Sequence, residues 1–219
     1  SFPQALRDNA SDNFTAINGL ALWLDASNID GGMNSSLSDG QTLSSWRDLS
    51  GNKNHGYAES NVKYIQNGGV NFDGIDGHIY IEDSETMRLS NYSIYIIFYL
   101  DGAIDEEWKG IFGKGGDYTE HFHNRNNNIW LNNELYIHHR FKSIVNSNDG
   151  PPDTPKDSIS INEDNLVQIE NSGNHAKTFI DGVKLAEATK TNQLILEGRT
   201  YVSRTLDNHN TYGKKPING

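Results

Sequence analysis

Carboxylates in glycine- and asparagine-rich loops are the side chains of this sequence best suited to metal chemistry. Asp48 opens the segment Asp48-Leu-Ser-Gly-Asn-Lys-Asn54, and Asp73 and Asp76 lie in the segment Asp-Gly-Ile-Asp-Gly. Calcium prefers about six to eight oxygen ligands, drawn from carboxylates, carbonyls and waters, and such loops can turn their carbonyls inward. We therefore expect a structural calcium, with Asp48, Asn52, Asp73 and Asp76 as candidate ligands. The alternative is that each aspartate caps its own turn through backbone hydrogen bonds.

Paired histidines form a second candidate for metal chemistry. His121 and His123 are two residues apart and would share a face of a strand, and His138-His139 follow on an expected neighbouring strand. Paired imidazoles suit zinc or nickel, but such a site needs a third and a fourth ligand. The sequence does not supply these ligands at a fixed spacing. We interpret the histidines as solvent-facing or hydrogen-bonded groups, or as part of a sugar-binding surface.

Aromatic residues beside polar loops are suited to binding sugars. A pyranose requires an aromatic ring against its C–H face and amide, carboxylate or cationic groups for its hydroxyls. We expect Trp23 and Trp46 to be core residues. The candidate ligand-binding residues are Trp108, Tyr118, His121, His123, Trp130, Arg140, His209 and Tyr212. For each of these residues, the alternative is packing beneath a loop.

The carboxylates do not form a catalytic pattern. Glycanases of the sandwich type place a nucleophile and a general acid on one strand at alternating positions, so that both face one sugar. Asp105, Glu106 and Glu107 are instead consecutive in a polar loop, and no Gly-x-Ser-x-Gly motif occurs. We therefore expect a protein that is not an enzyme.

Composition narrows the range of partners. The chain has 219 residues, a net charge of −11 and no cysteine. An acidic chain without a basic stripe is unsuited to nucleic acid, and the absence of cysteine excludes disulfides and cysteine-based zinc sites. No apolar run reaches the ~18 residues that span a bilayer, so we expect no membrane insertion. Glycans and divalent cations are the expected ligands.

Short apolar runs between turn signals indicate an all-β protein. Tyr92–Leu100 is apolar on both faces and is expected to be a central strand covered on both sides. Asp181-Gly182 between two alternating runs predicts a β-hairpin, and the three prolines of 146–156 predict an exposed loop. The expected strands are Leu20–Asp25, Val62–Ile65, Gly69–Phe72, His78–Glu82, Tyr92–Leu100, Lys109–Lys114, Asn128–Leu131, Leu135–Lys142, Asn165–Asn171, Lys177–Ile180, Val183–Ala188, Leu194–Glu197 and Thr200–Arg204.

Several segments resemble the concanavalin A-like, laminin G-like jelly-roll domains. The matching segments are Leu22-Trp-Leu-Asp-Ala-Ser27, Asp39–Gly56, Val70–Tyr80, Ile111-Phe-Gly-Lys-Gly-Gly116 and Phe179-Ile-Asp-Gly-Val-Lys184. The resemblance implies a two-sheet antiparallel jelly-roll sandwich over residues 19–219, after an N-terminal extension of residues 1–18. It is specific for the fold and weak for the ligand, because this fold carries lectins, adhesive domains and glycanases alike.

The resemblance also implies a location and a set of functions. We expect a non-catalytic, lectin-like module on an extracellular, cell or virion surface; a structural or adhesive domain that packs against neighbouring subunits is the alternative. Such domains usually end in a closing strand, whose pattern is missing at Pro216-Ile-Asn-Gly219. An open edge would pair with other strands. We therefore expect that residues 1–15 or a neighbouring chain cover that edge.

Overall fold

The computed structural model describes residues 17–66, 69–104, 108–115, 125–141, 150–189 and 197–203. In this part of the chain no helix is long and apolar enough to cross a bilayer. The regular elements are two short 3-10 helices, η2 (Ala26–Asn28) and η3 (Glu85–Met87), and the strands β1 (Ser45–Trp46), β2 (Gly56–Glu59), β3 (Val62–Ile65), β4 (Gly69–Phe72), β5 (His78–Ile81), β6 (Tyr92–Tyr99), β7 (Trp108–Gly115), β8 (Arg125–Asn132), β9 (Ile137–Arg140), β10 (Asp164–Ser172), β11 (His175–Ile180), β12 (Val183–Thr189) and β13 (Arg199–Val202).

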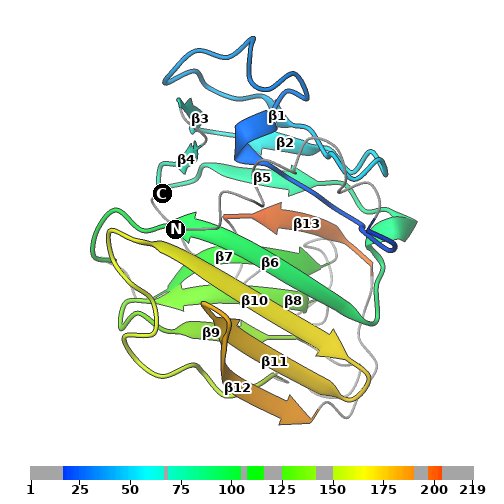
Figure 1. The fold of residues 1–219 in the computed structure, drawn as a ribbon, viewed down its shortest axis with the longest axis vertical. Helices are drawn as coiled ribbons and strands as arrows, with labels where there is room; N and C mark the ends of the chain where they lie inside the picture. Colours follow the sequence, from blue (N-terminus) through cyan, green and yellow to red (C-terminus); the bar gives the residue numbers. More distant parts are fainter. Residues whose placement is uncertain are drawn as a thin grey trace.

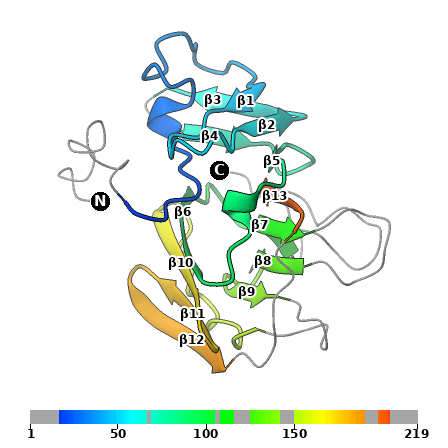
Figure 2. The same ribbon diagram turned by 90° about the vertical axis from the view of Figure 1, so that its right-hand side faces the viewer.

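Two antiparallel sheets pack face to face, which confirms the expected all-β sandwich (Figure 1). The larger sheet has seven strands in the order β1-β2-β5-β13-β7-β8-β9, and the smaller has four in the order β12-β11-β10-β6. Figure 2 shows the two layers from the side, with the β3-β4 ribbon at one end of the molecule. Strands distant in sequence, such as β5 and β13, are therefore neighbours.

The core forms because alternate residues of both sheets point into the space between them. Ile129 and Leu131 of β8 face Val167 and Ile169 of β10 in one cluster, and all four are fully buried. A second cluster lies beneath β3 and β4. It contains Trp46, as the sequence predicts, together with Ile29, Leu43, Val62, Tyr64, Phe72 and Ile79. Trp23, also expected in the core, is half-buried.

The predicted hairpin is confirmed. β11 and β12 pair from Ile180 and Val183 outward, and Asp181 and Gly182 have φ angles of 51° and 81°. Two successive positive φ values match the twist of the strands and explain the Asp-Gly pair. Residues 150–156 form a loop outside the sheets, as the prolines indicate.

The prediction that Tyr92–Leu100 is a central strand is wrong. β6 pairs with β10 alone among the described strands and is the edge of its sheet. Its side chains alternate in burial, and Tyr95, Ile97 and Tyr99 are 63%, 51% and 44% exposed. The apolar residues on its outward face are exposed, so a continuous apolar run does not here indicate burial on both sides.

The predicted strand Leu20–Asp25 does not belong to a sheet. The backbone of Trp23 instead bonds to the Asp48 loop: its N–H donates to Asp48 Oδ1 at 3.0 Å, and its carbonyl accepts from Leu49 N–H at 2.9 Å. The predicted strand Leu194–Glu197 lies largely outside the described residues. Residues 1–15, which were expected to cover an open edge of the sandwich, also lie outside them. Strands β1 and β2 were not predicted, because Ser45–Trp46 and Gly56–Glu59 are too short and polar to show a pattern.

Candidate functional site

One face of the seven-stranded sheet points away from the smaller sheet and carries several aromatic residues. We call it the outer face. Tyr57 of β2 pairs with Tyr80 of β5, and Tyr80 pairs with Tyr201 of β13, so the three side chains form a row across the strands. The rings of Tyr57 and Tyr80 are 5.4 Å apart, and the Arg199 guanidinium lies 5.0 Å from the centre of the Tyr80 ring.

A second aromatic group lies farther along the same face. The ring of His138 on β9 is 4.9 Å from Trp108 of β7 and 5.4 Å from Trp130 of β8. Tyr136 packs edge-on against Trp108 at 6.0 Å. Trp108 is half-buried and Trp130 is 6% exposed, so Trp130 fits its packing alternative better than an open sugar platform.

Arg140 and Asp153 add charge beside this group. The guanidinium of Arg140 donates from Nη2 to Asp153 Oδ1 at 2.9 Å, and from Nη1 to the carbonyls of His139 and Pro151 at 2.9 and 2.7 Å. A nitrogen of His138, Nδ1, lies 2.7 Å from the same Asp153 oxygen. The proline-rich loop thus places a carboxylate on the outer face, where it fixes the orientation of Arg140 and His138.

The structure brings together three of the predicted ligand-binding residues: Trp108, Trp130 and Arg140. Tyr118, His121, His123, His209 and Tyr212 lie outside the described residues. The tyrosine row and Asp153 could not be predicted from the sequence, because the residues that become neighbours across strands depend on the strand register, which one sequence does not reveal. The one available signal was the alternation in His78-Ile-Tyr-Ile81. It places Tyr80 on the face of the strand away from the two buried isoleucines, Ile79 and Ile81.

Asp48 acts as a cap. Its carboxylate is buried and accepts hydrogen bonds from the N–H groups of Trp23, Ser50 and Asn54 at 3.0, 2.9 and 2.9 Å. The Ser50 hydroxyl donates to its second oxygen at 2.8 Å. Asn52 donates its amide to the Leu20 carbonyl at 2.7 Å. Both oxygens of Asp48 are therefore engaged, which favours the capping alternative over calcium ligation.

Asp73 has the same role in its own turn. Its Oδ1 accepts from the N–H groups of Ile75, Asp76 and Gly77 at 2.9, 3.1 and 2.9 Å. Burial opposes ionisation, but these backbone donors outweigh it and lower the pKa of Asp73. Asp76 is exposed. The described part of the chain holds no group of three or more His, Cys, Asp or Glu arranged for a metal. Calcium at either loop stays a prediction.

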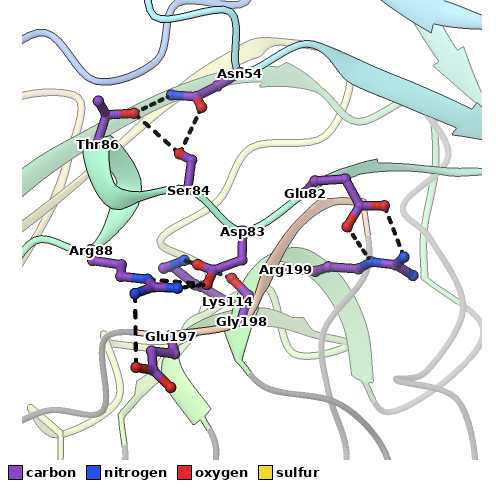
Figure 3. Close-up of polar contacts among 10 residues, drawn as sticks. All are labelled: Asn54, Glu82, Asp83, Ser84, Thr86, Arg88, Lys114, Glu197, Gly198 and Arg199. Atoms are coloured by element: carbon purple, nitrogen blue, oxygen red, sulfur yellow. Dashed lines mark hydrogen bonds and ion pairs between the residues drawn. The ribbon is translucent and has the colours of Figure 1, made fainter.

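A network of charged residues surrounds the buried Lys114 (Figure 3). Lys114 of β7 donates to the Gly198 carbonyl at 2.7 Å and lies 3.5 Å from Asp83, which also binds Arg88 at 2.6 Å. Burial lowers the pKa of Lys114, while Asp83 acts in the opposite direction. Burial tends to raise the pKa of Asp83, but Arg88 and Lys114 reverse the effect and lower it. The network joins β7 to the segments beside β5 and β13 and has a structural role.

The likeness of this chain to known proteins lies in its fold. No protein-family model matches the sequence, and a search of curated proteins finds no match. The structure resembles a Trypanosoma rangeli sialidase solved with sialic acid (TM-score 0.57, 13% identity), over 83% of this chain and 29% of the sialidase. The shared feature is the β-sandwich fold.

Two binding domains show the same likeness. One is the CBM40 of a Ruminococcus gnavus IT-sialidase bound to α2,3-sialyllactose (TM-score 0.51, 11% identity), over 65% of this chain and 84% of that one. The other is the binding domain of botulinum neurotoxin DC in complex with SialylT (TM-score 0.53, 13% identity), over 72% of this chain and 40% of that one. The chain thus spans less than half of the sialidase and toxin chains that it matches, and these likenesses concern the fold alone.

Proposed function

We propose that this protein is a non-catalytic carbohydrate-binding module and that the outer face of the seven-stranded sheet is its binding surface. The observation that carries the proposal is the combination of aromatic rings with fixed polar groups on one face. Tyr57, Tyr80 and Trp108 offer apolar plates for sugar C–H groups, and Arg140 with Asp153 offers oriented donors and acceptors. The structural neighbours that bind sialylated glycans support this class of ligand.

Location and family belong to the same proposal. A sandwich of this class, an acidic chain and the absence of cysteine suit a concanavalin A-like module on an extracellular, cell or virion surface. This location would expose the outer face to host or environmental glycans.

A second candidate function, structural or adhesive packing, is favoured by strand β6. This strand carries no charged residue, and Tyr95, Ile97 and Tyr99 are exposed on the sheet's outward face. An uncharged edge strand of this length pairs readily with another strand. A large subunit contact through β6 without glycan binding would favour this function.

Replacing Trp108 with alanine should weaken glycan binding about tenfold or more, because a large ring would be removed from the face. The measurement is binding of the wild-type protein and of Trp108→Ala to a glycan array, followed by calorimetric titration. Tyr95→Ala is the matched control, since it removes an exposed ring from the other sheet. Equal binding by wild type and Trp108→Ala would contradict the proposed surface.

Calcium binding is proposed as a separate property of the loops at Asp48 and Asp73. If calcium stabilises these loops, EDTA should lower the melting temperature by several degrees, and added calcium should restore it. Thermal unfolding followed by circular dichroism is the measurement. An unchanged melting temperature would mean that the two aspartates act as turn caps alone.

A further inference from the structure

A strip of the outer face that solvent reaches lies on β2, β5 and β13. At its centre are Tyr57 and Tyr80, whose rings are 5.4 Å apart and inclined by 30°. Tyr57 is 44% exposed and Tyr80 is half-buried. The two rings thus form one apolar plate that is open to solvent. We call the plate and the polar groups beside it the tyrosine strip; its residues are Tyr57, Glu59, His78, Tyr80, Glu82 and Arg199.

Each tyrosine of the plate has a carboxylate beside it. Glu59 follows Tyr57 by two residues on β2, so the two share a face of the strand. Glu82 follows Tyr80 by two residues, at the end of β5. Because β2 and β5 are antiparallel and Glu59 pairs with His78, the two carboxylates lie on opposite sides of the plate. Their side chains are 54% and 55% exposed, so a ligand on the plate can reach a carboxylate on either side.

The basic groups of the strip are each held by one of these carboxylates. Arg199 donates from Nε and Nη2 to the two oxygens of Glu82 at 2.9 and 2.8 Å, and its guanidinium lies 5.0 Å from the centre of the Tyr80 ring. On the other side, Nε2 of His78 lies 3.3 Å from Glu59 Oε2. The two pairs fix the carboxylates beside the plate. An anionic ligand would have to displace Glu82 to take its place on Arg199.

The strip combines an apolar surface with oriented acceptors. A carboxylate offers about four lone-pair sites for hydrogen bonds, and Arg199 occupies two of those on Glu82. The other sites can accept from the hydroxyl groups of a sugar, whereas they repel a negatively charged group. We infer that the tyrosine strip is a subsite for neutral sugar units, whose C–H faces lie on the plate and whose hydroxyls donate to Glu59 and Glu82.

The separation of the two carboxylates sets the length of the ligand. Glu59 pairs with His78, and Glu82 lies four residues farther along the chain. At the rise of a strand, their backbones are therefore roughly 13 Å apart along β5. One pyranose ring does not span this distance, whereas two linked rings do. The ligand is accordingly a neutral oligosaccharide of at least two units.

The inference rests on the proposed function and deepens it, since it names a subsite of the outer face and the class of sugar that it binds. Trp108 lies at the start of β7, whereas β13 pairs with the end of that strand, Phe112–Gly115. The tyrosine strip and the group around Trp108 are therefore separate parts of the face, and substitutions can test them one at a time.

The test uses Tyr57→Ala, which removes the exposed ring of the plate. An array of neutral oligosaccharides and their sialylated forms, such as lactose and α2,3-sialyllactose, identifies the best neutral ligand, and calorimetric titration with it gives Kd. We expect Tyr57→Ala to bind at least tenfold more weakly. Tyr99→Ala is the matched control, because it removes a tyrosine of equal exposure, 44%, from the other sheet, and it should bind like the wild type. The monosaccharides of the ligand should bind the wild type at least tenfold more weakly than the ligand itself.

A second variant, Glu82→Gln, tests the class of sugar. The amide keeps the shape of the side chain but no longer balances the charge of Arg199, so an anionic sugar can approach it. We expect the Kd of the sialylated form, divided by that of the neutral form, to fall at least threefold relative to the wild type. Glu85→Gln is the matched control: it removes an equal charge outside the strip and should leave this ratio unchanged.

The outcomes separate this inference from the proposed function. If the wild-type protein binds no glycan on the array, the proposed function fails and the inference fails with it. If the wild type binds a neutral oligosaccharide and Tyr57→Ala binds it equally well, the inference alone fails. A wild-type protein that binds the sialylated form at least tenfold more tightly than the neutral form would also overturn it, since the strip would then not be selective for neutral sugars.

Discussion

Replacing Asp48 with alanine should lower the free energy of unfolding by about 3–5 kcal/mol, the largest effect that we expect from one substitution. The buried carboxylate accepts four hydrogen bonds, three of them from backbone N–H groups of Trp23, Ser50 and Asn54. Alanine would leave these donors without a partner, and each buried unsatisfied donor costs roughly 1–3 kcal/mol. Urea unfolding monitored by tryptophan fluorescence measures the change.

Two further variants show whether the effect comes from capping. Asp48→Asn keeps one acceptor oxygen and should lose less than half as much stability. Asp76→Ala removes an exposed carboxylate from a similar loop and should change the free energy by no more than about 0.5 kcal/mol. Equal stability of Asp48→Ala and wild type would contradict the capping role.

The second large effect is a loss of stability in acid caused by His139. Burial lowers the pKa of His139 from 6.5 to about 3, and the positive charge of neighbouring Arg140 acts in the same direction. The neutral ring lies 2.7 Å from Asn127 Oδ1, with Nε2 as the donor, and its other nitrogen lies 3.5 Å from the Thr178 hydroxyl. The folded protein therefore excludes a proton that the unfolded chain binds.

The sign of the pH effect follows from this difference. Between about pH 6.5 and pH 3 the unfolded state binds more protons, so stability falls as the pH falls, by at most about 1.4 kcal/mol per pH unit. Aspartates with lowered pKa, such as Asp30 and Asp73, lose their contribution only below about pH 4. Glu187, whose pKa is lowered from 4.5 by its hydrogen bond to Lys184, begins to lose its contribution near the lower end of the range from pH 7 to 4.5. The contribution of His139 is therefore the difference between the wild type and a His139 variant over this range.

Urea unfolding at several pH values tests this expectation. His139→Gln should be less stable than wild type at pH 7 but should lose most of the dependence on pH down to 4.5. His138→Gln, one residue away on the outer face, should retain the dependence because His139 is unchanged. A wild-type protein with constant stability from pH 7 to 4.5 would show that His139 is not held neutral by burial.

Local patterns predicted the fold well. Val62–Ile65 and Gly69–Phe72 are strands with the predicted bounds, since alternation and turn residues are local features. The Asp181-Gly182 turn is also confirmed, and it was predictable because its signal, an Asp-Gly pair between two alternating runs, is local. The place of β6 at the edge of its sheet depends on strand order, which is set by contacts distant in sequence. A single sequence contains no local signal for strand order, and the prediction of a central strand was wrong.

The candidate site was only partly predictable. Trp108, Trp130 and Arg140 were identified because aromatic and cationic residues near polar loops stand out in a sequence. Tyr80 was not, because its importance arises from the register of the strands, which places it beside two other tyrosines. Capping by Asp48 and calcium ligation by Asp48 use the same residue types, so the sequence left both open.

The central claim is that glycans bind the outer face, and the indole N–H signals of the four tryptophans test it most directly. In a two-dimensional ¹H–¹⁵N NMR spectrum, the best glycan from the array is added to labelled protein. The account predicts that the signal of Trp108 shifts with saturating glycan, whereas that of Trp46, whose indole donates to the Asp25 carbonyl at 3.1 Å in the second core cluster, does not. A bound glycan that leaves Trp108 and the backbone signals of Tyr80 and Tyr201 unchanged, while shifting residues elsewhere, would contradict it.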